Sequence, residues 1–140
     1  PLDPNLRQSL IKYVYDIIGC MQYVHRQLGP GMPEYIYQEA LVRKLVKERF
    51  DVRKELEYHP LFDGEPLRGF IKMDMVVMMP RGNVIIECKS IKTITDKDQF
   101  QTFGYLRGTL FPIAILVNFG TWPKAQIERY YFHDGIIRAF

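Results

Sequence analysis

The central stretch IKMDMVVMMPRGNVIIECK, residues 71–89, contains two apolar runs separated by a short turn. The runs at 70–78 and 84–89 are rich in valine, isoleucine and methionine, and such runs favour strands when turn residues bound them. Pro80 and Gly82 lie between the two runs and are typical of a tight turn. The stretch therefore predicts a β-hairpin whose two strands are neighbours in a sheet.

Two acids and one lysine interrupt these otherwise apolar strands. Side chains alternate along a strand, so Glu87 and Lys89 lie on one face and Cys88 lies on the other. Asp74 lies in the first strand of the hairpin, and antiparallel pairing can bring it opposite Glu87. Burying three charges costs free energy unless they pair with one another or bind a metal ion. We therefore predict that Asp74, Glu87 and Lys89 form a chemically active group.

A divalent cation fits this group, because Mg²⁺ prefers oxygen ligands and is often held by one or two carboxylates together with phosphate oxygens. We predict Asp74, Glu87 and the backbone carbonyl of Cys88 as metal ligands. Lys89 would orient the attacking water or stabilise charge on a phosphate. The alternative is a surface hairpin with a solvated Glu87–Lys89 pair, which the apolar residues 84–86 disfavour.

Outside the hairpin, the hydrophobic pattern predicts three helices and four more strands. Thr95 or Asp96 is the expected cap of the last helix. No repeat or linker divides the chain, so we predict one mixed α/β domain over residues 1–140. The predicted helices cover residues 10–28, 34–49 and 96–108, and the further strands cover 52–59, 111–118, 127–133 and 136–140.

Composition narrows the class of protein without identifying an activity. The net charge of +3 is well below that of a strong electrostatic DNA binder. The sequence has neither a membrane-spanning apolar run nor an opening signal peptide, so no membrane partner is expected. Cys20 and Cys88 lie in apolar patterns and are predicted to be core residues. These features favour an intracellular protein of unknown compartment.

The spacing of the charged residues resembles the signature of the PD-(D/E)XK nuclease superfamily. Asp74 is separated by 12 residues from the triplet Glu87-Cys88-Lys89. Met73 stands where the signature's name has proline, a departure that is common in the superfamily. The resemblance implies a restriction-endonuclease-like fold, in which helices flank a central mixed sheet. It also implies a nuclease that uses Mg²⁺ or Mn²⁺ to hydrolyse phosphodiester bonds.

Two further motifs extend the resemblance. Residues 24–37, VHRQLGPGMPEYIY, resemble the VHxxLGPGxxExxY motif of the GxxExxY group, with Gly31, Glu34 and Tyr37 in the named positions. Residues 101–105, QTFGY, are similar to the QxxxY motif that follows E-x-K in several nucleases of the superfamily. With the Asp74 signature, the motifs span roughly residues 10–120 in matching order.

The first motif implies roles for residues near the start of the second helix. Glu34 would be a further acid of the metal site, and His25 and Tyr37 would support the residues that contact the metal. The alternatives are structural. Glu34 could be a helix N-terminal acid favoured by the macrodipole, while His25 and Tyr37 could be core residues.

The second motif implies contacts to the substrate. Gln101 and Tyr105 are four residues apart and share a helix face, and Arg107 follows closely. All three are predicted to contact nucleic acid, and the alternatives are a packed tyrosine and an exposed arginine. Lys92 and Lys97 are predicted to lie in solvent at the rim of the site, where they could contact phosphates.

Several functional alternatives remain open from the sequence. The chain could be a catalytically silent nuclease-like module that binds nucleic acid or a protein partner, or a phosphohydrolase that acts on a nucleotide. Nothing in the sequence separates DNA from RNA as the partner. A homodimer is a further option, through a patch of aromatic residues comprising Phe100, Phe103, Phe111, Phe119 and Trp122.

Overall fold

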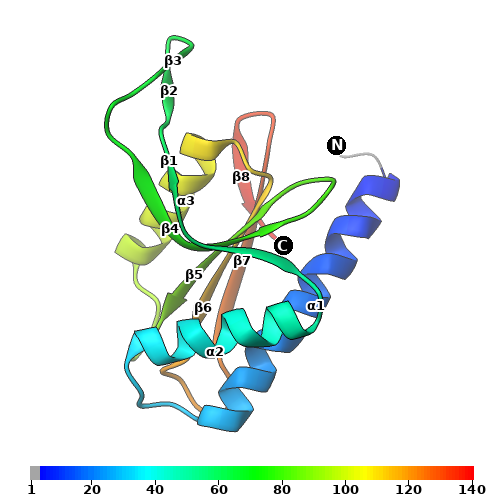
Figure 1. Ribbon diagram of the computed structural model, residues 1–140, viewed down its shortest axis with the longest axis vertical. Coiled ribbons are helices and arrows are strands. Elements are labelled where there is room, and N and C mark those ends of the chain that lie inside the picture. Colours follow the sequence, from blue (N-terminus) through cyan, green and yellow to red (C-terminus); the bar gives the residue numbers. More distant parts are fainter. Residues whose placement is uncertain (1–3) are drawn as a thin grey trace.

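The helices and strands follow the predicted order in a computed structural model that describes residues 4–140, the side chain of Leu6 excepted. Two helices come first, then strands, a third helix and the last strands (Figure 1). The elements are α1 (Pro4–Leu28), α2 (Glu34–Lys47), β1 (Asp51–Tyr58), β2 (Leu61–Phe62), β3 (Glu65–Pro66), β4 (Ile71–Met78), β5 (Val84–Lys89), α3 (Asp96–Thr109), β6 (Ile113–Asn118), β7 (Gln126–His133) and β8 (Ile136–Ala139).

Six strands form one mixed sheet in the order β1-β4-β5-β6-β7-β8. β4 and β5 pair in antiparallel fashion, as predicted for the central hairpin. β5 and β6 are the parallel pair, and Lys89 lies beside Asn118 at its end. The carboxyl ends of these two strands therefore meet at one edge of the sheet, which is where ligands commonly bind in α/β proteins.

Helices cover both faces of the sheet (Figure 1). Ile86 and Cys88 pack in one buried cluster with residues of α1 and α2. Ile85 packs in a second cluster with Leu106 of α3. The predicted alternation along β5 is thus confirmed, and the restriction-endonuclease-like mixed sheet flanked by helices is the observed fold.

The ends of α2 and α3 lie close to the predicted ones, whereas α1 begins at Pro4, earlier than the predicted residue 10. Thr95 caps α3 in a capping box with Asp98, so Thr95, not Asp96, is the cap. α2 ends at Lys47, slightly earlier than predicted, since Arg49 has a φ of 72° and a left-handed residue cannot continue a helix. Among the described residues, no helix is long and apolar enough to span a membrane.

Two sequence predictions need correction. No strand was predicted between β1 and β4, but β2 and β3 form an additional small hairpin there. Each of its strands has two residues, too few to show periodicity. The expected aromatic patch is also wrong in its membership, because Phe119 is fully buried and stacks on Tyr37 with ring centroids 4.7 Å apart.

Candidate active site

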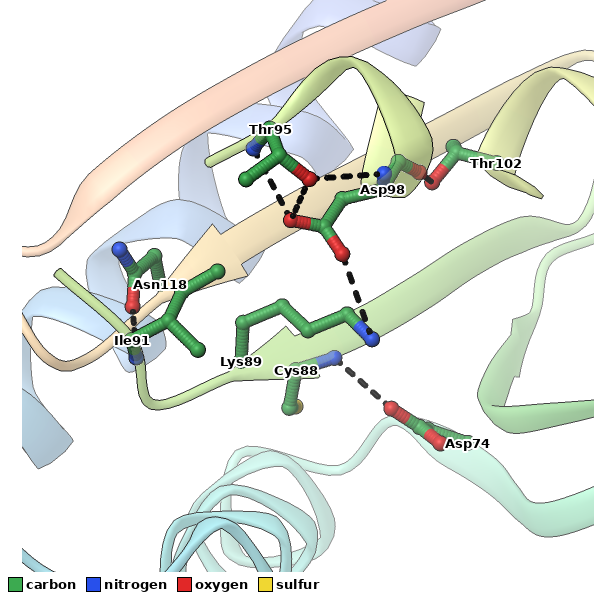
Figure 2. Close-up of polar contacts among 8 residues, drawn as sticks. All are labelled: Asp74, Cys88, Lys89, Ile91, Thr95, Asp98, Thr102 and Asn118. Atoms are coloured by element: carbon green, nitrogen blue, oxygen red, sulfur yellow. Dashed lines mark hydrogen bonds and ion pairs between the residues drawn. The ribbon is translucent and has the colours of Figure 1, made fainter. Parts of the chain in front are cut away.

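Asp74 and Glu87 lie where strands β4 and β5 stop pairing. The ladder between these strands ends at Met75 and Ile86. Beyond that point, the Asp74 backbone N–H donates to the Glu87 carboxylate over 2.7 Å. The Cys88 backbone N–H donates to the Asp74 carboxylate over 2.9 Å (Figure 2). Side-chain oxygens thus replace backbone carbonyls, and both carboxylates are held between the separating strands.

The other neighbour of β4 is also irregular at this position. β1 pairs with β4 on either side of Asp74, but Asp74 and Glu55 form no ladder pair. Glu55 has a φ of 48°, a left-handed conformation that is uncommon for a residue other than glycine. Met73 and Met75, although two residues apart, pack in different clusters on opposite faces of the sheet. The backbone at Asp74 is therefore locally irregular, and no sequence pattern indicated it.

Burial raises the pKa of both carboxyl groups of the pair. Glu87 is only 4% exposed, and burial, followed by the nearby Asp74 charge, raises its pKa to about 8. The hydrogen bond from the Asp74 backbone and the charge of Lys89 oppose this rise. Burial also raises the pKa of Asp74. Two negative charges are thus costly here unless a proton or another cation accompanies them.

Lys89 extends from the end of β5 toward the first turn of α3 (Figure 2). Its Nζ lies 3.7 Å from Asp98 Oδ1, and both side chains are mostly buried. The other Asp98 oxygen, Oδ2, accepts from the backbone and hydroxyl of Thr95, each over 2.9 Å. One carboxylate therefore caps the helix and also contacts the lysine. Sequence reasoning missed Asp98, although its position three residues after Thr95 is that of a capping box.

Glu34 is the first residue of α2 and is half-buried beside this group. Burial raises its pKa, Lys89 opposes that rise, and Asp74 adds to it. Glu34 is thus electrostatically coupled to the site. However, no three His, Cys, Asp or Glu side chains gather to hold a metal ion in the part of the chain that the structure describes. Asp74 and Glu87 come together, and the expected cluster with Glu34 as a third acid is not assembled.

The side chains of Tyr37 and His25 form hydrogen bonds with the backbone of nearby loops. The buried Tyr37 hydroxyl donates to the Gly29 carbonyl and accepts from the Met32 backbone N–H. His25 is also buried, and its Nε2 donates to the Thr121 carbonyl over 2.7 Å. The Met32 carbonyl in turn accepts from Ser90, which follows Lys89. Residues 28–34, the LGPGMPE segment, are thereby held against the end of β5.

The predicted substrate contacts on α3 differ in their surroundings. Burial, followed by the charges of Glu87 and Asp74, raises the pKa of Tyr105 to about 12, so Tyr105 lies near the carboxylate pair. Gln101 and Arg107 are exposed on the same helix. The structure therefore brings Tyr105 to the site and leaves Gln101 and Arg107 facing solvent.

The oxygen atoms at this site suit a hard divalent cation. One oxygen of each carboxylate, Glu87 Oε2 and Asp74 Oδ2, accepts a hydrogen bond from the backbone. A cation between Asp74 and Glu87 would offset the repulsion that raises the Glu87 pKa. A groove of about 590 Å³ between α2 and β1, lined by Gln38 and Lys54 among others, reaches Asp74 from solvent. The residues present thus fit Mg²⁺ or Mn²⁺.

Comparisons with known proteins identify the superfamily of the chain from its sequence. The structure described as "Crystal structure of SSO0001" is similar at a TM-score of 0.46 and 18% identity, over 75% of this chain and 48% of that one. This chain thus spans about half the length of that protein, 48%. No curated protein matches the sequence. The family model of the PD-(D/E)XK nuclease superfamily matches residues 11–130. Since that match spans most of the 140 residues, the chain belongs to the PD-(D/E)XK nuclease superfamily.

Proposed function

We propose that this protein is a divalent-metal-dependent nuclease that hydrolyses phosphodiester bonds of nucleic acid. The observation that carries the proposal is the Asp74–Glu87 pair, which is held by backbone hydrogen bonds between separating strands. Lys89 lies at the end of the same strand as Glu87. Membership of the superfamily supports nuclease chemistry in general, and this pair supplies the oxygen ligands that such chemistry needs.

Each residue of the proposed site would have a distinct role in binding the metal ion, the water or the substrate. Asp74, Glu87 and the Cys88 carbonyl would hold Mg²⁺ or Mn²⁺, which when bound neutralises phosphate charge and lowers the pKa of water. Lys89 would orient the attacking water or stabilise charge on the phosphate. Glu34 interacts with both Asp74 and Glu87 through its charge, and we assign it to waters around the metal. Tyr105 would position the substrate backbone.

The LGPGMPE loop supports assignment to the GxxExxY group. The motif's tyrosine, Tyr37, bonds to both sides of this loop, and its glutamate, Glu34, begins the next helix. In this proposal the hydrogen bonds of the motif hold Glu34 close to the end of β5. Ser90 contributes by donating to the Met32 carbonyl over 2.8 Å.

A cleavage assay tests the proposal directly. Labelled single- and double-stranded DNA and RNA are incubated with the protein and Mg²⁺, Mn²⁺ or EDTA. We expect cutting of at least one polymer with a metal ion and none with EDTA. If no polymer is cut under any condition while binding is retained, the protein is the catalytically silent module instead. Cutting of free nucleotides alone would indicate the phosphohydrolase.

Asp98 is predicted to position the ammonium group of Lys89. Asp98→Asn keeps an oxygen that can cap α3 but removes the charge near Lys89. We expect the cleavage rate at saturating substrate to fall about tenfold, within the coupling range of contacting polar residues. Substrate affinity should be unchanged, because Asp98 is not assigned to substrate.

A double-mutant cycle separates positioning from general destabilisation. If Asp98 acts through Lys89, then Asp98→Asn has no further effect in a Lys89→Ala background. Asp96→Asn, an exposed acid in the same turn, is the matched control and should retain full activity. Equal losses from Asp98→Asn in both backgrounds would show that Asp98 only stabilises the helix.

A further inference from the structure

Three loops are joined at the sheet edge that carries Lys89. They are residues 29–33, 90–95 and 119–125, and we call them the edge loops. The Ile91 backbone N–H donates to Asn118 Oδ1 over 3.0 Å, close to the end of β6 (Figure 2). The Ile94 N–H donates to Gln126 Oε1 over 3.0 Å, which ties the second loop to the start of β7. Ser90 joins the second loop to the first. These hydrogen bonds hold the loops together at the end of β5 that carries Lys89.

Trp122 lies on the last of the edge loops and is the one tryptophan of the chain. Its side chain is 75% exposed. The backbone that carries it is nevertheless held on several sides. The Thr121 carbonyl accepts from His25, and the Thr121 hydroxyl donates to the Lys124 carbonyl over 2.6 Å. Gly120 packs so closely that an added Cβ would lie 2.2 Å from the Ile91 carbonyl oxygen. A well-supported backbone therefore presents a large aromatic ring to solvent.

The charges around Trp122 favour a polyanionic partner. Lys92, Lys97 and Lys124 are exposed on residues 90–97 and 119–125, and Asp96 is the exposed acid of the same segments. Cations beside an exposed aromatic ring are the combination with which proteins bind single-stranded nucleic acid. A single exposed tryptophan without cations beside it would not indicate a binding site for nucleic acid. Here the ring, Lys92 and Lys124 lie on the loops that follow β5 and β6, and β5 carries Glu87 and Lys89.

We propose that Trp122 stacks on an unpaired nucleobase of the substrate while the phosphodiester to be cleaved lies at the metal site of Asp74 and Glu87. Lys92, Lys97 and Lys124 would contact neighbouring phosphates. Within a duplex each base face is covered by its neighbours, so a flat aromatic surface selects unpaired bases, at single strands, overhangs or loops. This inference rests on the proposed nuclease function and deepens it, because it names nucleic acid with a single-stranded stretch as the substrate class.

The emission of Trp122 reports on this contact without any added label. The Lys89→Ala variant, in which cutting is expected to be about 10²–10³-fold slower, is titrated with a single strand of about 12 nucleotides, within known site sizes. A blunt duplex of the same sequence is titrated in parallel. We expect the single strand to quench Trp122 emission in a salt-sensitive manner, and the duplex to bind more weakly with little quenching. Anisotropy of end-labelled strands measures binding independently.

Substitution tests the same contact by affinity. In the Lys89→Ala background, Trp122→Ala should weaken single-strand binding about tenfold or more, the scale of one base–aromatic stack. Trp122→Phe should recover part of the loss, because a ring remains. Tyr15→Ala is the matched control, since Tyr15 is also 75% exposed but lies on α1 away from the edge loops. That variant should bind like its parent.

The outcomes separate this inference from the proposed function. The inference is overturned if single-stranded nucleic acid binds without changing Trp122 emission and binds Trp122→Ala as tightly as its parent. Metal-dependent cleavage would in that case still support the nuclease. Emission that changes with protein concentration alone would identify a second copy as the occupant and also overturn it. If the wild-type protein neither binds nor cuts any polymer, the proposed function fails and the inference fails with it.

Discussion

Lys89→Ala is expected to lower metal-dependent cleavage by about 10²–10³-fold, the usual effect of removing one group that stabilises transition-state charge. The Lys89 ammonium follows Glu87 by two residues on the same strand face and lies 3.7 Å from Asp98. Alanine removes this cation from the site but leaves both carboxylates and their backbone hydrogen bonds in place. The loss should therefore appear mainly in the turnover rate, with metal dependence retained in any residual activity.

The control for this substitution is Lys92→Ala, an exposed lysine on the loop after β5. It is expected to weaken binding modestly at low salt and to leave turnover at saturating substrate unchanged. Thermal unfolding of both variants checks that the fold is intact. A Lys89→Ala protein that cleaves as fast as the wild type would show that Lys89 has no role in the reaction. The proposed site would then consist of the carboxylate pair.

The sequence was most informative where local pattern and burial agree. The run Val84–Lys89 predicted its strand to the residue, because turn residues precede it and a loop follows it. Alternation placed Glu87 and Lys89 on the face opposite Cys88, and the packing of the two clusters agrees. The buried β6 strand was predicted for a similar reason, since a continuous apolar run is typical of a strand covered on both faces.

The details of the site depend on contacts between distant residues, which local patterns do not specify. The strands separate at Asp74 because side chains replace the ladder, and no alternation rule predicts where that happens. Glu55 is an ordinary strand residue in the sequence, yet it adopts a left-handed φ of 48° beside this break. Asp98 could be predicted as a capping residue, but its contact with Lys89 requires α3 to pack against the end of β5.

The GxxExxY-like stretch shows the difference between recognising a motif and knowing its role. Its residues were identified from the sequence as candidate site residues. In the structure, Tyr37 and His25 are buried and form hydrogen bonds with loop backbone. The motif's glutamate, Glu34, begins the helix that follows the first of these loops. Such a role follows from hydrogen bonds between segments as far apart in sequence as His25 and Thr121, which are 96 residues apart.

Glu87→Gln is expected to stabilise the metal-free protein at pH 8. The pKa of Glu87 is raised from 4.5 to about 8 in the fold, mainly by burial. Between these values the folded protein holds a proton that the unfolded chain has released, so stability falls as pH rises from about 4.5 to 8. Each tenfold change in proton affinity is about 1.4 kcal/mol, so the loss amounts to a few kcal/mol. Glutamine carries no charge and keeps an oxygen to accept from the Asp74 backbone.

Thermal unfolding in EDTA at pH 5 and pH 8 measures this effect. The wild-type Tm should fall with pH, and Glu87→Gln should exceed it by about 5–10 °C at pH 8, as expected for a few kcal/mol in a domain of this size. Glu57→Gln is the matched control, because Glu57 is an exposed carboxylate on β1 and should change neither Tm. Added Mg²⁺ or Mn²⁺ should raise the wild-type Tm at pH 8 but not that of Glu87→Gln, since the metal binds the ionised carboxylate. A variant that is less stable than the wild type at pH 8 in EDTA would show that Glu87 is ionised and well compensated in the fold, and the metal would then not be needed to relieve its charge.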